Sequence, residues 1–110
     1  MFNFFSMLDD YEECKVDTYD ADGLFIDTCY VSDGQKDYET AVEHPDYKDG
    51  KMIIVEAYDT KEDAQVGHDK WVKIMTTEPL PDVLSDCSNA SVAQLGELVG
   101  MDILFPRKRR

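Results

Sequence analysis

The stretch from Met52 to Met75 constrains the fold of this chain more than any other part. It opens with Met-Ile-Ile-Val-Glu-Ala-Tyr, in which five of the first six residues are apolar. That density is typical of a central strand covered on at least one face. Asp59 or Thr60 then predicts a helix cap, and Asp59 with Glu62 has the spacing of a capping box. A strand that runs directly into a capped helix predicts a helix packed on a sheet.

The helix predicted after this cap has one apolar face, formed by Ala64, His68, Trp71 and Met75. Gly67 lies inside the helix and costs about 1 kcal/mol relative to alanine, so we expect close packing against a strand or a partner backbone at this position. No nucleophile or orienting group with a recognisable motif accompanies His68. We therefore expect a hydrogen-bonded histidine at the edge of the core.

The remaining elements are predicted from local patterns. Alternating apolar residues predict a hairpin over 14–20 and 24–31 and a third strand over 38–42, while helical spacing predicts short helices over 3–13 and 90–99. The expected fold is α+β, with an antiparallel β-meander of about four strands, one main helix packed on one face, and a second short C-terminal helix. A chain of this length supports one core, so we expect a single domain over 1–106 and a basic tail over 107–110.

The turn between the first two strands sets their register. Asp20-Ala21-Asp22-Gly23 fits a three-residue loop in which Asp20 lies opposite Leu24. That register pairs Lys15 with Cys29, puts Ile26 and Thr28 on the core face, and leaves Asp17 across from Asp27 on the other face. It also directs the thiols of Cys14 and Cys29 to opposite faces, so that they cannot form a disulfide.

The charge of the chain is strongly acidic and unevenly distributed. The sequence has 24 Asp and Glu against 11 Lys and Arg, and four of the basic residues are Arg107-Lys108-Arg109-Arg110. The body repels nucleic-acid phosphates and anionic membranes, so we expect no direct nucleic-acid partner and no membrane partner. A surface that binds it is expected to be basic.

No pattern of catalytic, metal-binding or cofactor-binding residues is present. Asp20, Asp22 and Gly23 match three positions of a calcium loop, but Cys29 stands where the bidentate glutamate belongs. No basic neighbour activates Cys29 or Cys87 as a nucleophile. We therefore expect a protein that is not an enzyme and uses no cofactor.

The residues available for contacts with a partner lie at the apolar ends, on the outer face of the hairpin and in the tail. The candidates are Phe2, Phe4, Phe5, Asp17, Asp27, Ile103, Leu104, Phe105, Arg107, Lys108, Arg109 and Arg110.

About two-thirds of the chain resembles a small group of phage and prophage proteins for which no activity is known. The resemblance is carried by 38–47, Gly50-Lys51, 54–56, 58–62, Gly67-His68 and 70–72. It implies a phage setting, with the protein in the cytoplasm of the infected host or in the virion. It implies no catalytic residues.

We therefore expect a non-enzymatic phage-encoded accessory or virion protein that contacts other phage proteins or a host protein, with oligomer or assembly formation as a further possibility. The alternative is an acidic nucleic-acid mimic that inhibits a nucleic-acid-binding or defence protein of the host. This alternative predicts that the acidic residues of 9–63 form one stripe.

Overall fold

The computed structural model describes residues 14–31, 36–87 and 103–108. The helices expected over 3–13 and 90–99 lie outside the described residues. No helix in the described part is long and apolar enough to cross a membrane.

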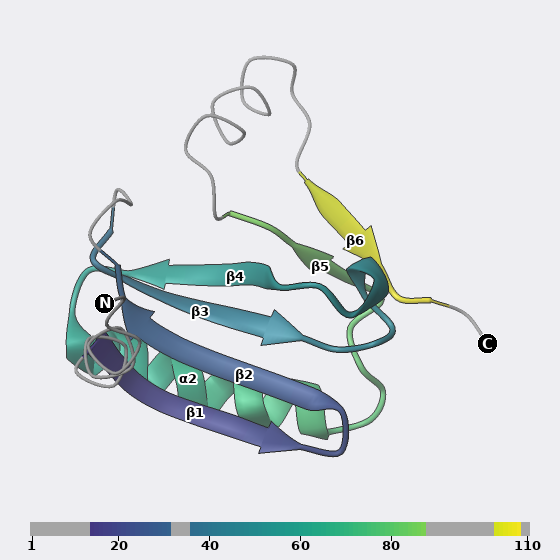
Figure 1. Cartoon of the computed structure of the whole chain (residues 1–110), viewed down its shortest axis with the longest axis horizontal. Coiled ribbons are helices and arrows are strands. Elements are labelled where there is room, and N and C mark those ends of the chain that lie inside the picture. Colours follow the sequence, from purple (N-terminus) through teal and green to yellow (C-terminus); the bar gives the residue numbers. More distant parts are fainter. Residues whose placement is uncertain (1–13, 32–35, 88–102, 109–110) are drawn as a thin grey trace, which may run out of the picture.

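A four-stranded antiparallel sheet forms the centre of the fold. Its strands are β1 (Lys15–Ala21), β2 (Leu24–Tyr30), β3 (Tyr38–Glu43) and β4 (Ile53–Tyr58), in that spatial order. Helix α2 (Lys61–Thr76) crosses one face and lies behind the sheet in Figure 1. The expected α+β meander with one main helix on one face is confirmed.

The start and the buried face of α2 agree with the sequence pattern. Of the two predicted caps, Thr60 is the one used, and its hydroxyl accepts a hydrogen bond from the backbone N–H of Asp63 at 3.1 Å. The residues of α2 that are buried are Ala64, Gly67, His68 and Met75. Trp71 is partly buried and packs against the core.

The turn between β1 and β2 differs from the expected one. Ala21, not Asp20, lies opposite Leu24. The loop therefore has two residues, Asp22 and Gly23, and both have positive φ, as the favoured two-residue hairpin turns require.

This shift of one residue places side chains of β1 on the opposite face of the sheet from the one predicted. Thr18, not Asp17, lies across from Asp27, and Asp17 lies across from Thr28 on the helix side of the sheet. The expected pairing of Asp17 with Asp27 is wrong for this reason. An irregularity between Lys15 and Asp17 restores the predicted pairing of Lys15 with Cys29.

A second, two-stranded sheet was not predicted. It pairs β5 (Val83–Ser85) with β6 (Leu104–Pro106), and it lies beside β4 (Figure 1). Leu84 is 2% exposed, and the opposite residue Phe105 packs against the main core. The short apolar segment before the tail therefore docks on its own domain.

A 3-10 turn, η1 (Lys48–Gly50), joins β3 to β4 near this second sheet. The preceding Tyr47 is 1% exposed, and its hydroxyl donates to the carbonyl of Pro81. Tyr47 thus links the β3–β4 connection to the segment before β5.

Candidate functional site

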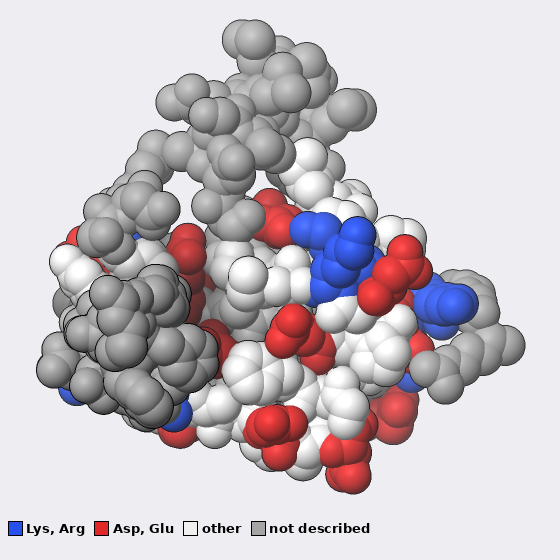
Figure 2. All heavy atoms as spheres, in the orientation of Figure 1, with Lys and Arg blue, Asp and Glu red and all other residues white. Residues whose placement is uncertain are grey.

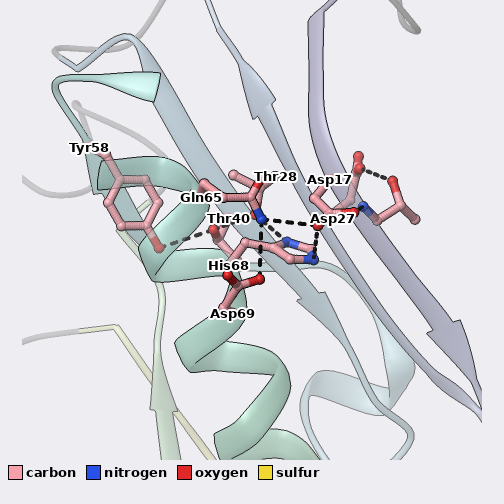
Figure 3. A network of polar contacts seen from close by, with 9 residues as sticks. Asp17, Asp27, Thr28, Thr40, Tyr58, Gln65, His68 and Asp69 are labelled. Carbon is pink, nitrogen blue, oxygen red and sulfur yellow. Dashed lines mark hydrogen bonds and ion pairs between the residues drawn. The ribbon is translucent and has the colours of Figure 1, made fainter. Parts of the chain in front are cut away.

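A line of polar side chains is buried between α2 and the sheet (Figure 3). His68 Nδ1 lies 2.8 Å from Thr28 Oγ1, which lies 2.6 Å from Thr40 Oγ1. Thr40 Oγ1 lies 3.0 Å from the hydroxyl of Tyr58. One residue from each of α2, β2, β3 and β4 therefore joins a continuous network.

The network ends at Glu56, whose Oε1 accepts hydrogen bonds from the hydroxyl of Tyr58 and from Nε1 of Trp71 at 2.9 Å. Lys70 Nζ also contacts this oxygen. Partial burial raises the pKa of Glu56, but the hydrogen bonds from Lys70 and Trp71 outweigh that effect and lower the pKa below its ordinary value. Glu56 is therefore the ionised acceptor of the network.

Proton counting fixes the direction of these hydrogen bonds. Each hydroxyl has one proton, and the proton of Tyr58 goes to Glu56. Thr40 must then donate to Tyr58, and Thr28 must donate to Thr40. The oxygen of Thr28 consequently accepts, so Nδ1 of His68 is the protonated donor.

The other ring nitrogen of His68 faces Asp17 on β1. Nε2 lies 3.9 Å from Asp17 Oδ2, and Gln65 donates to the same oxygen at 3.0 Å. Gln65 also donates to Asp69. The hydrogen bond from Gln65, followed by the one from the backbone N–H of Thr18, lowers the pKa of Asp17 below its ordinary value.

The network contains the residue types of a catalytic triad, namely a hydroxyl, a histidine and a carboxylate. It differs from a triad because a substrate cannot reach the hydroxyls. Thr28 and Thr40 are fully buried, and His68 is 2% exposed. A nucleophilic hydroxyl must reach its substrate, and Thr28 already donates to a neighbouring side chain. The network is therefore suited to fixing α2 on the sheet, and the hydrogen bond expected for His68 is present.

A cavity of about 490 Å³ lies between β1 and α2, lined in part by His68 and Asp69. The Asp69 carboxylate accepts from Gln65. Cys29 lies on the opposite face of β2 from Thr28, because alternate residues of a strand face opposite sides. His68, Cys29 and Asp69 are therefore not assembled into one reactive site.

The thiols of Cys29 and Cys87 are not activated. Burial, together with a hydrogen bond to Asp27, raises the pKa of Cys29 to about 12. Partial desolvation and the nearby carboxylates of Glu39 and Asp86 also raise the pKa of Cys87, which is exposed. Both groups are held in the thiol form, which is a weak nucleophile. All three cysteines are free.

A second cavity, of about 530 Å³, lies where β6 meets the β3–β4 connection and is lined by residues that include Asp46, Glu78 and Arg107. Asp46 is 4% exposed, and its Oδ2 accepts a hydrogen bond from Arg107 Nε at 3.1 Å. Arg107 Nη1 also lies 3.6 Å from Glu78. The first residue of the basic tail is thus bound to the acidic body.

An apolar row faces outward on the β5–β6 ribbon. Leu84 and Phe105 point to the core, so their strand neighbours Val83, Leu104 and Pro106 point away from it. Val83 is 42% exposed and Leu104 is 51% exposed. The ribbon therefore presents large apolar side chains on the surface.

The face of the sheet opposite α2 is mixed acidic and apolar. Figure 2 shows this side, on which red acidic groups are separated by white surface and blue basic groups gather mainly beside η1 and β6. Strand alternation places Asp20, Asp27, Glu39 and Glu43 on it, around Phe25 and Ala41. Other acids, including Glu62, Asp63 and Asp69, lie on α2.

The predicted contact residues fall into three groups. Ile103, Leu104 and Lys108 are exposed, and Asp27 lies on the outer face of the sheet. Phe105, Arg107 and Asp17 are engaged within the domain by the contacts described above. The third group lies outside the described residues and consists of Phe2, Phe4, Phe5, Arg109 and Arg110.

Sequence reasoning missed Val83 and Pro106, because nothing local marks a three-residue strand whose partner lies some twenty residues away. It also missed Thr40 and Tyr58 as members of the network, although their alternation with Val42 and Glu56 could have placed them on the helix side.

These features define a small α+β protein in which buried polar side chains join α2 to the sheet and both apolar and acidic side chains lie on the surface. In the described part of the chain, no three His, Cys, Asp or Glu side chains are grouped to hold a metal ion. Comparisons with protein-family models, curated proteins and solved structures found no match.

Proposed function

We propose that this chain is a non-enzymatic phage-encoded accessory or virion protein that acts by binding another protein. The observation that carries the binding role is the exposed apolar row of Val83, Leu104 and Pro106. Contiguous apolar side chains on a surface mark sites of protein contact. The phage setting rests on the sequence resemblance described above.

The position of the row supports this role. Lys48 Nζ lies over the ring of Phe105, 4.8 Å from its centroid, and Arg107 is held by Asp46. These contacts fix β6, so the row is presented on a braced ribbon.

The alternative function, an acidic mimic of nucleic acid that inhibits a host protein, has less support. Four carboxylates share the outer face of the sheet, but others lie on α2 and around the cavity at Asp46. The described acids thus occupy several surfaces and do not form one stripe. We retain protein binding through the apolar row as the proposal.

The experiment is affinity purification of the tagged full chain from infected host cells, read by mass spectrometry. We would compare the wild type with a Val83→Glu, Leu104→Glu double variant. The matched control is Val66→Glu on α2, where the side chain is 69% exposed. Urea denaturation of each purified variant checks that it folds.

We expect a phage or host protein that is recovered with the wild type and with Val66→Glu and is lost with the double variant. Purified phage particles are analysed in parallel for the chain itself. The chain being absent from particles and recovered without any partner would contradict the proposal. If the double variant still bound the same partner, the apolar row would not be the contact surface.

A further inference from the structure

We propose that the outer edge of β1 is a second binding site, which takes an extended, basic segment of a partner protein as an added strand. In the described part of the chain, the only strand that pairs with β1 is β2. The outer edge of such a strand presents backbone N–H and C=O groups that can pair with another chain. This site is separate from the β5–β6 row.

The backbone of Thr18 shows how the edge is occupied. Its N–H donates to Asp17 Oδ1 at 2.8 Å. A carboxylate oxygen of the preceding residue therefore takes the place that a carbonyl of an added strand would fill. A partner strand can exchange one acceptor for the other without breaking a hydrogen bond of the sheet.

The space beside this edge accommodates side chains of the added strand. The cavity of about 490 Å³ between β1 and α2 is lined by apolar Tyr19 and Val72, by two acidic residues, Asp17 and Asp69, and by one basic residue, Lys73. Because strand side chains alternate, every second residue of an added strand would point toward this cavity. Apolar and basic side chains fit its lining.

The acidic residues at the edge select the occupant. Asp17 is 47% exposed and has a lowered pKa, and Asp20 follows it on the same strand. Pairing β1 with β1 of a second copy would bring these carboxylates together, which is unfavourable. A strand rich in lysine or arginine has the complementary charge.

The test uses the ¹⁵N-labelled full chain and a blocked eight-residue peptide of alternating lysine and valine. We expect NMR shift changes in β1 and in the part of α2 that lines the cavity, with slower exchange of the Thr18 amide. One control peptide has glutamate in place of lysine. The other is N-methylated at alternate residues, which removes main-chain donors but keeps the side chains.

Charge reversal at the edge supplies matched variants. We expect Asp17→Lys to weaken peptide binding about tenfold. Asp59→Lys, where the side chain is 75% exposed next to α2, makes the same charge change and should leave binding unaltered. The N-methylated and glutamate peptides should not bind.

Absence of binding, shifts confined to other surfaces, or equal binding of the N-methylated peptide would each overturn the inference. The outcome is distinguishable from failure of the proposed function. A partner lost from infected cells with the Val83 and Leu104 substitutions, together with no peptide binding at β1, upholds that function and rejects only the edge site.

Discussion

The hydroxyl of Thr28 joins His68 of α2 to Thr40 of the adjacent strand, with its oxygen 2.8 Å from Nδ1 and 2.6 Å from the second hydroxyl. Both neighbours are buried, and among the described residues no buried side-chain nitrogen or oxygen lacks a partner. Removing this one hydroxyl therefore affects two polar groups that cannot reach water.

We predict that Thr28→Val lowers the free energy of unfolding by about 1–3 kcal/mol, since the shape is kept and buried groups lose their partner. Urea denaturation measures the change. In the wild type, the Nδ1 proton of His68 should be visible by NMR as a slowly exchanging signal, and the variant should lose it. Thr77→Val, at an exposed position just after α2, is the control. If Thr28→Val were as stable as the wild type, the network would not contribute to the stability of the fold.

Gly67 provides a second test, because a Cβ built at this position overlaps the ring of Tyr58. Alanine is the better helix former by about 1 kcal/mol, yet we expect Gly67→Ala to destabilise the protein by about 1–3 kcal/mol through overpacking. In a Tyr58→Ala background the ring is gone, and the same substitution should be neutral or stabilising. Equal effects in both backgrounds would contradict the contact as the cause.

The ion pair between Asp46 and Arg107 predicts an anchored β6. Arg107→Ala leaves a carboxylate that is 4% exposed without this cation, and we expect the free energy of unfolding to fall. Lys108→Ala is the matched control, since Lys108 contacts Asp46 through its backbone N–H. Limited proteolysis should cleave near β6 faster in the first variant only. Identical cleavage of both variants would argue against the anchor.

The lowered pKa of Glu56 predicts a stability that depends on pH. Its ordinary value is 4.5, and the folded value lies below that. The unfolded chain therefore binds the proton more readily, so the contribution of Glu56 is present above about pH 4.5 and is lost as the pH falls through the folded value. Glu56→Gln should flatten this loss in urea titrations between pH 6 and 3. The free energy of unfolding of Glu56→Gln should still depend on pH, but less steeply, because the pKa of Asp17 is also lowered.

The raised pKa of Cys29 predicts a thiol that reacts slowly in the folded protein. With a pKa of about 12, few molecules hold the thiolate at pH 8, whereas an unperturbed cysteine has a pKa of about 8.5. We expect alkylation of Cys29 by iodoacetamide at pH 8 to be much slower in the native chain than in urea. Mass spectrometry of the modified peptides measures both rates. Comparable rates would contradict the shielding of this thiol.

The sequence was sufficient for the elements whose signals are local. The apolar run at Met52–Tyr58, the cap at Asp59 or Thr60 and the helical face with Ala64 and Met75 predicted β4 and α2 within one or two residues. Gly67 was correctly interpreted as a close contact, although its partner, Tyr58, could not be named from the pattern. Local propensity and periodicity need only neighbouring residues, which is why they were reliable here.

Tertiary structure decided what depends on register and on distant pairing. A turn one residue shorter moved Asp17 from the outer face to the cavity beside His68, because side chains alternate along a strand. The β5–β6 pair and the bond of Arg107 to Asp46 join residues far apart in the sequence. Such contacts have no local signal, since they form only when the whole core assembles. The sequence by itself determined the four strands of the main sheet, the main helix and the acidic charge, and only the tertiary structure decided the β5–β6 pair and which side chains share a surface.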